Sequence, residues 1–455
     1  MASTYLSATL GTATNRKKWT FSAWIKRSTH TVGEAIFSSY SEDSTSWYSR
    51  LADNGSGSFD FTEYSGSAYT INLRPNALQR DVNGWYHLVL MYDSAQSTAS
   101  NRVKYYINGE QITSWHTESY PAQNKESGIN KNQLHTIGKS TQNNTYYFNG
   151  SMSHIHFCDG YAYAASDFGS TDATTGEWKI NTSPSVSYGT NGFFILKDGN
   201  GVTDQSPNSN NWTISGTLTK TEDCPSNVFA TYNKNISQTA NVAGRNSSVG
   251  ISLINGNLSN GATAAIFVNQ LSTLGFSKGK FYAEFLTTGD TYAAVGIVNS
   301  KYGDVSLGAY IGSDTTSGVN NIGYQSVTGA VKKNNSTSYT GATYTSANDI
   351  VGVAVDMDNN YIYFSKNGTW QNSGDPTSGS TGTGGVAITQ DTYFFASDAH
   401  NNTGSGTQYI HANFGNGYFG TSAISSAGTN ASGNGIFEYD VPTGYTALST
   451  KGLNL

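Results

Sequence analysis

Hydrophobic and polar side chains alternate in short runs through the first half of the chain. In the run 19–26, for example, Trp19 and Phe21 alternate with small polar residues. An alternation with a period of two residues indicates β-strands that bury one face. The pattern predicts strands at 19–26, 35–40, 59–64, 85–92, 102–107, 111–113, 134–138 and 148–157. Asn108-Gly109 follows one of these strands, and this dipeptide readily adopts the two positive φ angles of a type I′ hairpin turn.

The second half begins with a change in composition. From about residue 233 the sequence is rich in Ser, Asn and Gly and poor in aromatic residues, which indicates a domain boundary. Strand patterns then resume at 264–268, 279–285, 293–298, 307–312 and 350–368, and the last of these contains two strands joined by an acidic turn. We therefore predict two domains, residues 1–232 and 233–455.

The composition indicates an all-β protein. Charged residues make up 12% of the chain, well below the roughly 25% usual in soluble domains. This low content excludes long surface helices with repeated Glu–Lys pairs. Aromatic residues make up 13% and hydrophobic residues 36%, which is enough to fill cores and argues against disorder. A length of 455 residues suits two sandwich domains.

Charge and cysteine content exclude several partner classes. The net charge of −6 does not favour a nucleic acid partner, because binding to phosphates needs clustered cations. No apolar run approaches the roughly 18 residues of a membrane-spanning helix, so we expect no membrane insertion. The N-terminus lacks the basic flank and apolar run of a signal peptide. The two cysteines, Cys158 and Cys224, provide neither a disulfide framework nor a cysteine metal quartet.

The strands of the first half resemble the laminin-G-like branch of the concanavalin A-like jelly rolls. The segments that carry this resemblance are 21–26, 84–89, 103–109, 137–138 and 148–150. It implies an antiparallel β-sandwich, and members of this family commonly bind glycans or matrix proteins, some of them through calcium. Residues 159–232, which end in Cys224-Pro225-Ser226-Asn227-Val228-Phe229-Ala230-Thr231-Tyr232, resemble the extension that follows such modules in many bacteriophage virion-associated proteins.

The second half resembles the SPRY domain, which is another concanavalin-like two-sheet sandwich. The matching segments are 279–285, 295–297, 351–356, 362–368 and 412–415, and the polar stretch 373–385 departs from the common pattern. SPRY domains bind proteins through surface loops and are not catalytic. The resemblance therefore supports the fold of this half more strongly than it supports any particular binding partner.

The acidic residues do not predict an active site. A glycoside hydrolase needs two carboxylates about 5 to 9.5 Å apart that flank one bond. Asp356 and Asp358 have a suitable spacing but lie at a turn, and Asp60 and Glu63 are expected on opposite faces of a strand. We therefore predict that the protein is not an enzyme, and a sandwich glycoside hydrolase is the least favoured alternative.

Metal binding has only weak signals. His154 and His156 share a strand face, a spacing at which two imidazoles can chelate a metal, but a half-buried strand is the simpler interpretation. The loop carboxylates Asp53, Asp93 and Asp159 are hard ligands of the kind that calcium needs. We expect no cofactor, with calcium in the first sandwich as the alternative.

Aromatic residues in loops are the better candidates for ligand binding. Exposed rings supply stacking area for sugars at little cost in side-chain entropy. The candidates are Trp47 and Tyr48, Trp115 with His116 and Tyr120, Tyr146 and Tyr147, and Trp370. The first choice is the 115–120 segment, which follows a hairpin strand. The alternative is that these rings simply cover the ends of the cores.

The combined resemblances predict a non-enzymatic surface component of a phage virion. We expect a fibre or decoration subunit that adheres to a host-surface glycan or protein and contacts other virion proteins. A purely structural cement protein of the capsid or tail is the alternative. Such components generally form symmetric homo-oligomers. The sequence leaves the choice between capsid and tail open.

Overall fold

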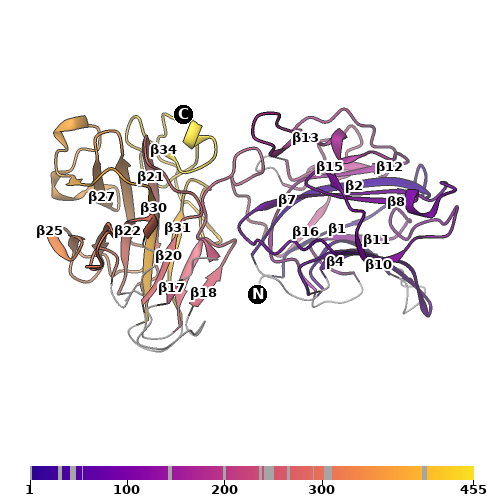
Figure 1. Cartoon of the computed structure of the whole chain (residues 1–455), viewed down its shortest axis with the longest axis horizontal. Coiled ribbons are helices and arrows are strands. Elements are labelled where there is room, and N and C mark those ends of the chain that lie inside the picture. Colours follow the sequence, from indigo (N-terminus) through magenta and orange to yellow (C-terminus); the bar gives the residue numbers. More distant parts are fainter. Residues whose placement is uncertain are drawn as a thin grey trace. The chain divides into compact units, whose positions relative to one another are not determined.

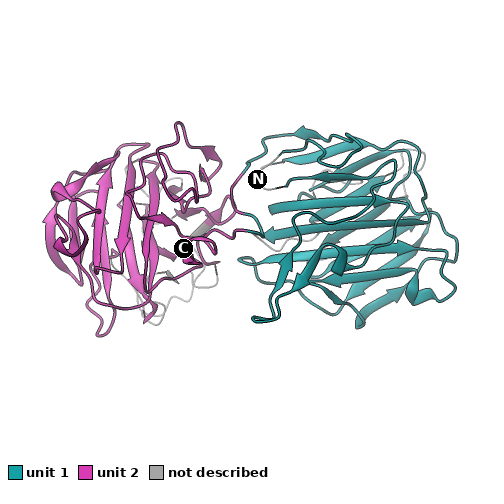
Figure 2. Cartoon of the chain, turned by 90° about the horizontal axis from the view of Figure 1, so that it is seen from above, with its two compact units in different colours: residues 1–220, 224–226 teal, residues 221–223, 227–455 magenta. Residues whose placement is uncertain are grey.

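The computed structural model forms two compact units, each built of mainly antiparallel sheets (Figures 1 and 2). It describes residues 3–28, 33–40, 48–53, 55–141, 146–197, 201–234, 238–239, 251–263, 267–289, 292–301, 310–401 and 407–454. Parts of the predicted strands 264–268 and 307–312 lie outside these residues. Short 3₁₀ turns are the only helical elements in the described part, and no helix there is long and apolar enough to cross a membrane. The predicted all-β sandwich class is therefore confirmed.

Unit 1 comprises residues 1–220 and 224–226. Its eight-stranded sheet has the order β10 (Trp115–Ser119), β6 (Ala68–Pro75), β5 (Phe59–Ser65), β4 (Tyr48–Asp53), β3 (Ala35–Tyr40), β11 (Leu134–Ile137), β1 (Tyr5–Thr9) and β16 (Thr213–Ser215). Its six-stranded sheet has the order β15 (Phe193–Ile195), β12 (Gly150–Asp159), β2 (Lys18–Arg27), β7 (Trp85–Asp93), β8 (Val103–Ile107) and β9 (Glu110–Gln111).

The core of unit 1 follows from the period-two pattern. Trp19 and Phe21 on β2 point between the sheets and are fully buried. The Trp19 ring stacks on Tyr92, with the ring centroids 5.2 Å apart. Asn108 and Gly109 adopt φ angles of 48° and 84°, as expected for the predicted type I′ turn between β8 and β9.

A segment that follows the sandwich covers the outer face of the six-stranded sheet. It contains the small hairpin of β13 (Gly169–Thr171) and β14 (Trp178–Ile180), which lies beyond this sheet in Figure 1. Phe168 and Trp178 from this segment pack with Val89 and Cys158, which point outward from β7 and β12. The stretch 163–188 therefore forms a second, thin core layer of unit 1, whereas β15 and β16, which follow it in the chain, are strands of the two sandwich sheets.

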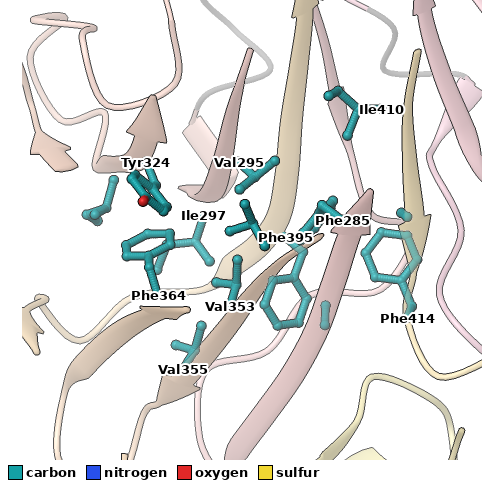
Figure 3. Packing of buried hydrophobic residues seen from close by; sticks show 14 of the residues in the cluster. Phe285, Val295, Ile297, Tyr324, Val353, Val355, Phe364, Phe395, Ile410 and Phe414 are labelled. Carbon is teal, nitrogen blue, oxygen red and sulfur yellow. The ribbon is translucent and has the colours of Figure 1, made fainter. Parts of the chain in front are cut away.

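Unit 2 comprises residues 221–223 and 227–455. Its seven-stranded sheet has the order β17 (Gln238–Thr239), β20 (Phe267–Leu271), β30 (Tyr393–His400), β22 (Ala294–Asn299), β23 (Asn321–Gln325), β24 (Ala330–Lys333) and β25 (Ser336–Thr340). The main path of the second sheet is β18 (Ile251–Ile254), β19 (Ser259–Ala262), β31 (Gln408–Asn413), β21 (Lys280–Thr287), β26 (Ile350–Asp356), β27 (Tyr361–Lys366) and β28 (Thr369–Trp370), joined at its side by β29 (Val386–Ala387) and β34 (Thr446–Ala447). Figure 3 shows side chains of both sheets meeting in the core, among them Phe285, Val353 and Phe395.

The C-terminal segment covers the outer face of the second sheet of unit 2. Phe437 and Tyr445 are buried there against Tyr282 and Tyr363, and β34 pairs in parallel with β21. In unit 2, Ile311 and Val319 also pack against Ala294 and Val298 of the seven-stranded sheet, so both sheets of this unit carry a covering segment.

The packing places the division between the units earlier than the sequence analysis did. The chain passes between the units within residues 221–226, whereas the predicted boundary lay between 232 and 233. Phe229 and Tyr232 are buried in clusters of unit 2. The change in composition near residue 233 therefore follows the first residues that pack into unit 2.

Candidate functional site

The outer face of the eight-stranded sheet carries a group of tyrosines on three neighbouring strands. On β4, Leu51 points into the core, so Tyr48 and Arg50 point away from it. Tyr64 lies opposite Tyr48 on β5. A register shift between β5 and β6 brings Tyr69 opposite Tyr64, on the same outer face.

These three rings pack on one another. Tyr48 stacks on Tyr64 with centroids 5.7 Å apart and an interplanar angle of 10°, and Tyr69 meets Tyr64 edge to face at 5.1 Å. The Tyr48 hydroxyl donates a hydrogen bond to the Tyr69 hydroxyl at 3.5 Å. Tyr69 keeps 50% of its surface exposed. We call Tyr48, Tyr64 and Tyr69 the tyrosine cluster.

Arg50 lies beside the tyrosine cluster. Its guanidinium carbon is 4.9 Å from the centroid of the Tyr48 ring and 5.9 Å from that of Tyr146. Burial, together with the hydrogen bond to Tyr69, raises the pKa of Tyr48, so its hydroxyl stays neutral. The predicted residues Tyr48 and Tyr146 are thus brought together through Arg50.

Tyr147 belongs to a second aromatic group. Its ring lies 6.1 Å from Tyr5 on β1, and the Lys139 ammonium lies 4.3 Å from the Tyr5 centroid and 5.6 Å from that of Tyr147. Lys139 is only 9% exposed. This group consequently offers a ligand less open surface than the tyrosine cluster.

The other predicted aromatic residues do not form an open platform. Trp115 and Tyr120 meet edge to face at 6.4 Å and pack against the core of unit 1, whereas His116 between them is exposed. Trp370 packs against the covered face of unit 2, 6.4 Å from Tyr282. Trp47 lies outside the described residues. For Trp115, Tyr120 and Trp370, packing at the end of a core describes the geometry better than a binding site does.

The three candidate calcium ligands lie in separate places and bind N–H donors. Asp53 forms a buried ion pair with Arg27, and Asp93 pairs with Lys18 at 3.3 Å. Asp159 is fully buried and accepts four hydrogen bonds, from the backbone amides of residues 14, 15 and 191 and the side chain of Asn130. In the described part of the chain, no group of three or more His, Cys, Asp or Glu could hold a metal ion.

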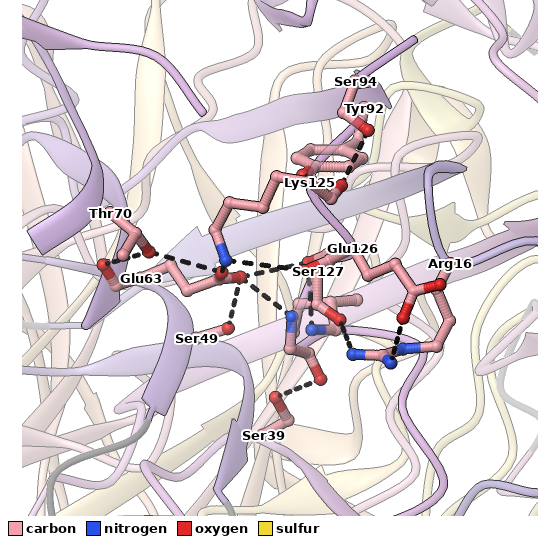
Figure 4. Close-up of polar contacts among 12 residues, drawn as sticks. Arg16, Ser39, Ser49, Glu63, Thr70, Tyr92, Ser94, Lys125, Glu126 and Ser127 are labelled. Atoms are coloured by element: carbon pink, nitrogen blue, oxygen red, sulfur yellow. Dashed lines mark hydrogen bonds and ion pairs between the residues drawn. The ribbon is translucent and has the colours of Figure 1, made fainter. Parts of the chain in front are cut away.

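The acidic pairs weighed for catalysis are likewise engaged in local structure. Asp356 pairs with Lys280 at 2.8 Å, and Asp358 accepts a hydrogen bond from the Gly279 amide. Glu63 points to the opposite side of β5 from Asp60, as the spacing predicted. Figure 4 shows Glu63 accepting hydrogen bonds from Ser49 and Ser127 and pairing with Lys125. Glu63 also accepts a hydrogen bond from the Gly128 amide.

His154 and His156 lie under the covering segment of unit 1 rather than on an open face. The His156 ring stacks on Phe194 with the centroids 3.9 Å apart, and its Nδ1 lies 2.9 Å from the Tyr188 hydroxyl. Nearby, Trp178 donates a hydrogen bond to Nδ1 of His87 at 3.0 Å. Burial lowers the pKa of His87 to about 3 and that of His156 well below its usual value, and the positive potential of neighbouring His154 adds to both shifts.

Sequence reasoning missed Arg50, Tyr64 and Tyr69. Tyr64 and Tyr69 flank the Gly66 turn. The alternation in 59–64 places Tyr64 on the face of its strand that points away from the core, whereas Phe61 lies on the core face. These signals could have identified an outward tyrosine at a hairpin end. The stacking on Tyr48 could not be predicted, because it depends on how β4 pairs with β5 and on the register shift in β6.

Comparisons with known proteins support both sandwiches. Residues 1–166 match the Laminin_G_3 family, described as the concanavalin A-like lectin/glucanases superfamily, and residues 280–387 match the SPRY domain. No curated protein matches the chain in sequence.

Solved structures resemble the chain at low identity. The SPRY domain of human HERC1 is 15% identical, with a TM-score of 0.29 over 40% of this chain and 96% of that one. Domains LG4-5 of mouse laminin α1 are 9% identical, with a TM-score of 0.27 over 87% and 78%. Domain 4 of AbnA, a GH43 extracellular arabinanase from Geobacillus stearothermophilus in complex with arabinotriose, is 17% identical, with a TM-score of 0.25 over 32% and 63%. By the family matches, the chain carries a laminin-G-like, concanavalin A-like domain and a SPRY domain in tandem.

Proposed function

We propose that the protein is a non-enzymatic binding protein whose tyrosine cluster holds a glycan. The observation that carries this proposal is the packing of three tyrosines on the outer face of the eight-stranded sheet, where Tyr69 remains half exposed. The half-exposed Tyr69 ring is an amphipathic surface: the ring contacts the C–H groups of a sugar, and the hydroxyl binds its hydroxyls. Domains of the laminin G and SPRY types often bind carbohydrates or proteins, which fits this use.

The proposal is tested by glycan binding of the full chain with single tyrosine substitutions. We expect Tyr64→Ala and Tyr69→Ala to lower the affinity for any bound glycan at least about fivefold, since an aromatic contact contributes roughly 1 kcal/mol or more. Tyr161→Ala is the matched control, because Tyr161 is 40% exposed but lies next to β2 of the other sheet. Unchanged glycan binding in both variants would reject the site.

We further propose that SPRY-like unit 2 contacts a protein while unit 1 contacts the glycan. The support is the family match at residues 280–387 and the polar stretch 373–385, which departs from the common SPRY pattern. Cross-linking of the full chain in its native setting, followed by mass spectrometry, tests this division. Partner cross-links confined to unit 1 would contradict it.

The biological setting that we propose is the surface of a phage particle, where the chain serves as an oligomeric fibre or decoration subunit. The support is the resemblance of residues 159–232 to the extension in phage virion proteins. A cement protein that binds only neighbouring virion proteins is the second candidate. Antibody labelling of intact particles tests the location, and a particle that assembles and adheres normally without the chain would count against both roles.

A further inference from the structure

Arg50 differs from the other arginines of the described chain in having no hydrogen-bond acceptor. Five further arginines lie in that part of the chain, and each donates a hydrogen bond or forms an ion pair; they are Arg16, Arg27, Arg74, Arg80 and Arg102. For Arg50, the contacts are the rings of Tyr48 and Tyr146. Its side chain is partly exposed on the outer face of β4.

Among the described residues, no carboxylate forms an ion pair with Arg50. Asp60, a carboxylate on the same outer face, lies opposite Ala52 rather than Arg50 and is 4.0 Å from Arg74. Tyr48 cannot supply a counter-charge, because its hydroxyl is neutral. The rings of Tyr48 and Tyr146 contact the guanidinium, and within the part of the chain that the structure describes its N–H groups have no hydrogen-bond acceptor.

A guanidinium presents paired N–H donors that match the two oxygens of a carboxylate. We propose that the tyrosine cluster binds an acidic saccharide, with the sugar ring against Tyr64 and Tyr69 and its carboxylate on Arg50. This inference rests on the proposed glycan-binding function and names the class of glycan. It requires no metal ion, because the protein itself provides the cation.

The test compares two polymers that share one backbone. Binding of the full chain to polygalacturonate and to its methyl ester is measured by calorimetry, and dextran sulfate and dextran form a second pair. We expect tight binding to polygalacturonate, at least tenfold weaker binding to the methyl ester, and loss of this difference in Arg50→Gln. Arg80→Gln is the control, because Arg80 is exposed and bonds the backbone of Ser56.

The outcomes separate the class of glycan from the proposed function. Equal binding of polygalacturonate and its methyl ester, unaffected by Arg50→Gln, would overturn the proposal that the ligand is an acidic saccharide. In that case Tyr69→Ala would still test whether the tyrosine cluster binds a glycan. Preference for dextran sulfate over polygalacturonate, dependent on Arg50, would replace the carboxylate by a sulfate and overturn the proposal. Loss of polygalacturonate binding in Arg50→Gln with an unchanged unfolding curve would support it. Binding of no glycan at all would reject both the class and the function.

Discussion

The buried Asp159 carboxylate holds together three parts of unit 1 that are far apart in sequence. Its oxygens accept hydrogen bonds from the amides of Thr14 and Asn15, from the amide of Asn191 and from the Asn130 side chain. A carboxylate with four N–H donors is already satisfied, so it has no need of calcium. Its role in unit 1 is that of an acceptor that fixes loops.

We expect Asp159→Ala to lower the free energy of unfolding of unit 1 by about 3 kcal/mol or more, because buried donors then lose their partner. Urea unfolding followed by tryptophan fluorescence measures this. The control is Asp172→Ala, since Asp172 binds Lys179 at the surface, and this change should shift the midpoint little. Equal shifts of the unfolding midpoint in the two variants would show that Asp159 does not hold these loops together.

The buried histidines make unit 1 sensitive to acid. Burial lowers the pKa of His87 to about 3 and that of His135 to about 4, and His156 is also lowered. In the unfolded chain these groups bind protons near pH 6.5. The stability that the neutral rings provide is therefore complete above about pH 6.5 and is lost as the pH falls toward 4.

We expect the free energy of unfolding of unit 1 to fall between pH 7 and pH 5, with a smaller fall in His156→Gln than in the native chain. Denaturant curves at the two pH values measure the difference. His116→Gln, a change at an exposed position of β10, serves as the control. An identical pH dependence in His156→Gln and the native chain would contradict this account.

At the scale of elements, one carboxylate attaches the C-terminal segment of unit 2 to β21. Glu284 is fully buried and accepts hydrogen bonds from the amides of Glu438 and Tyr439 and from the Tyr282 hydroxyl. Burial raises the pKa of Glu284 to about 7, against the opposing effect of these hydrogen bonds. These hydrogen bonds attach the C-terminal segment that covers the outer, aromatic face of the second sheet of unit 2.

We expect Glu284→Ala to destabilise unit 2 by about 3 kcal/mol, because two backbone amides lose a buried acceptor. Hydrogen exchange at the amides of Glu438 and Tyr439 should accelerate more than exchange within β26. Glu438→Ala is a useful comparison, since its side chain accepts from Ser425 at an exposed position. Uniform acceleration throughout unit 2 in Glu284→Ala would mean that the segment does not open separately.

The sequence predicted those elements whose causes are local. The alternation around Trp19 and Phe21 and the Asn108-Gly109 turn are local features, and both were predicted correctly. The role of Asp159 was not, because its donors lie up to 145 residues away along the chain. The tyrosine cluster was predicted only for Tyr48, since Tyr64 and Tyr69 join it through strand pairing that no local pattern encodes.

At the scale of the whole molecule, tryptophan fluorescence monitors the unfolding of unit 1 almost exclusively. Seven of the eight lie in unit 1, and Trp370 alone lies in unit 2. Separate hydrophobic cores are expected to unfold as separate cooperative units. Tryptophan fluorescence therefore follows unit 1, whereas hydrogen exchange within β26 follows the core of unit 2.

This arrangement predicts that substitutions in one unit leave the other unchanged. Asp159→Ala should shift the fluorescence transition but not the exchange of β26, and Glu284→Ala should do the reverse. In the double variant the two effects should add, because distant sites without shared partners are independent. If either single change shifted both signals by the same free energy, the two sandwiches would unfold as one cooperative body. The tyrosine cluster of unit 1 would then depend for its stability on the packing of the SPRY-like unit.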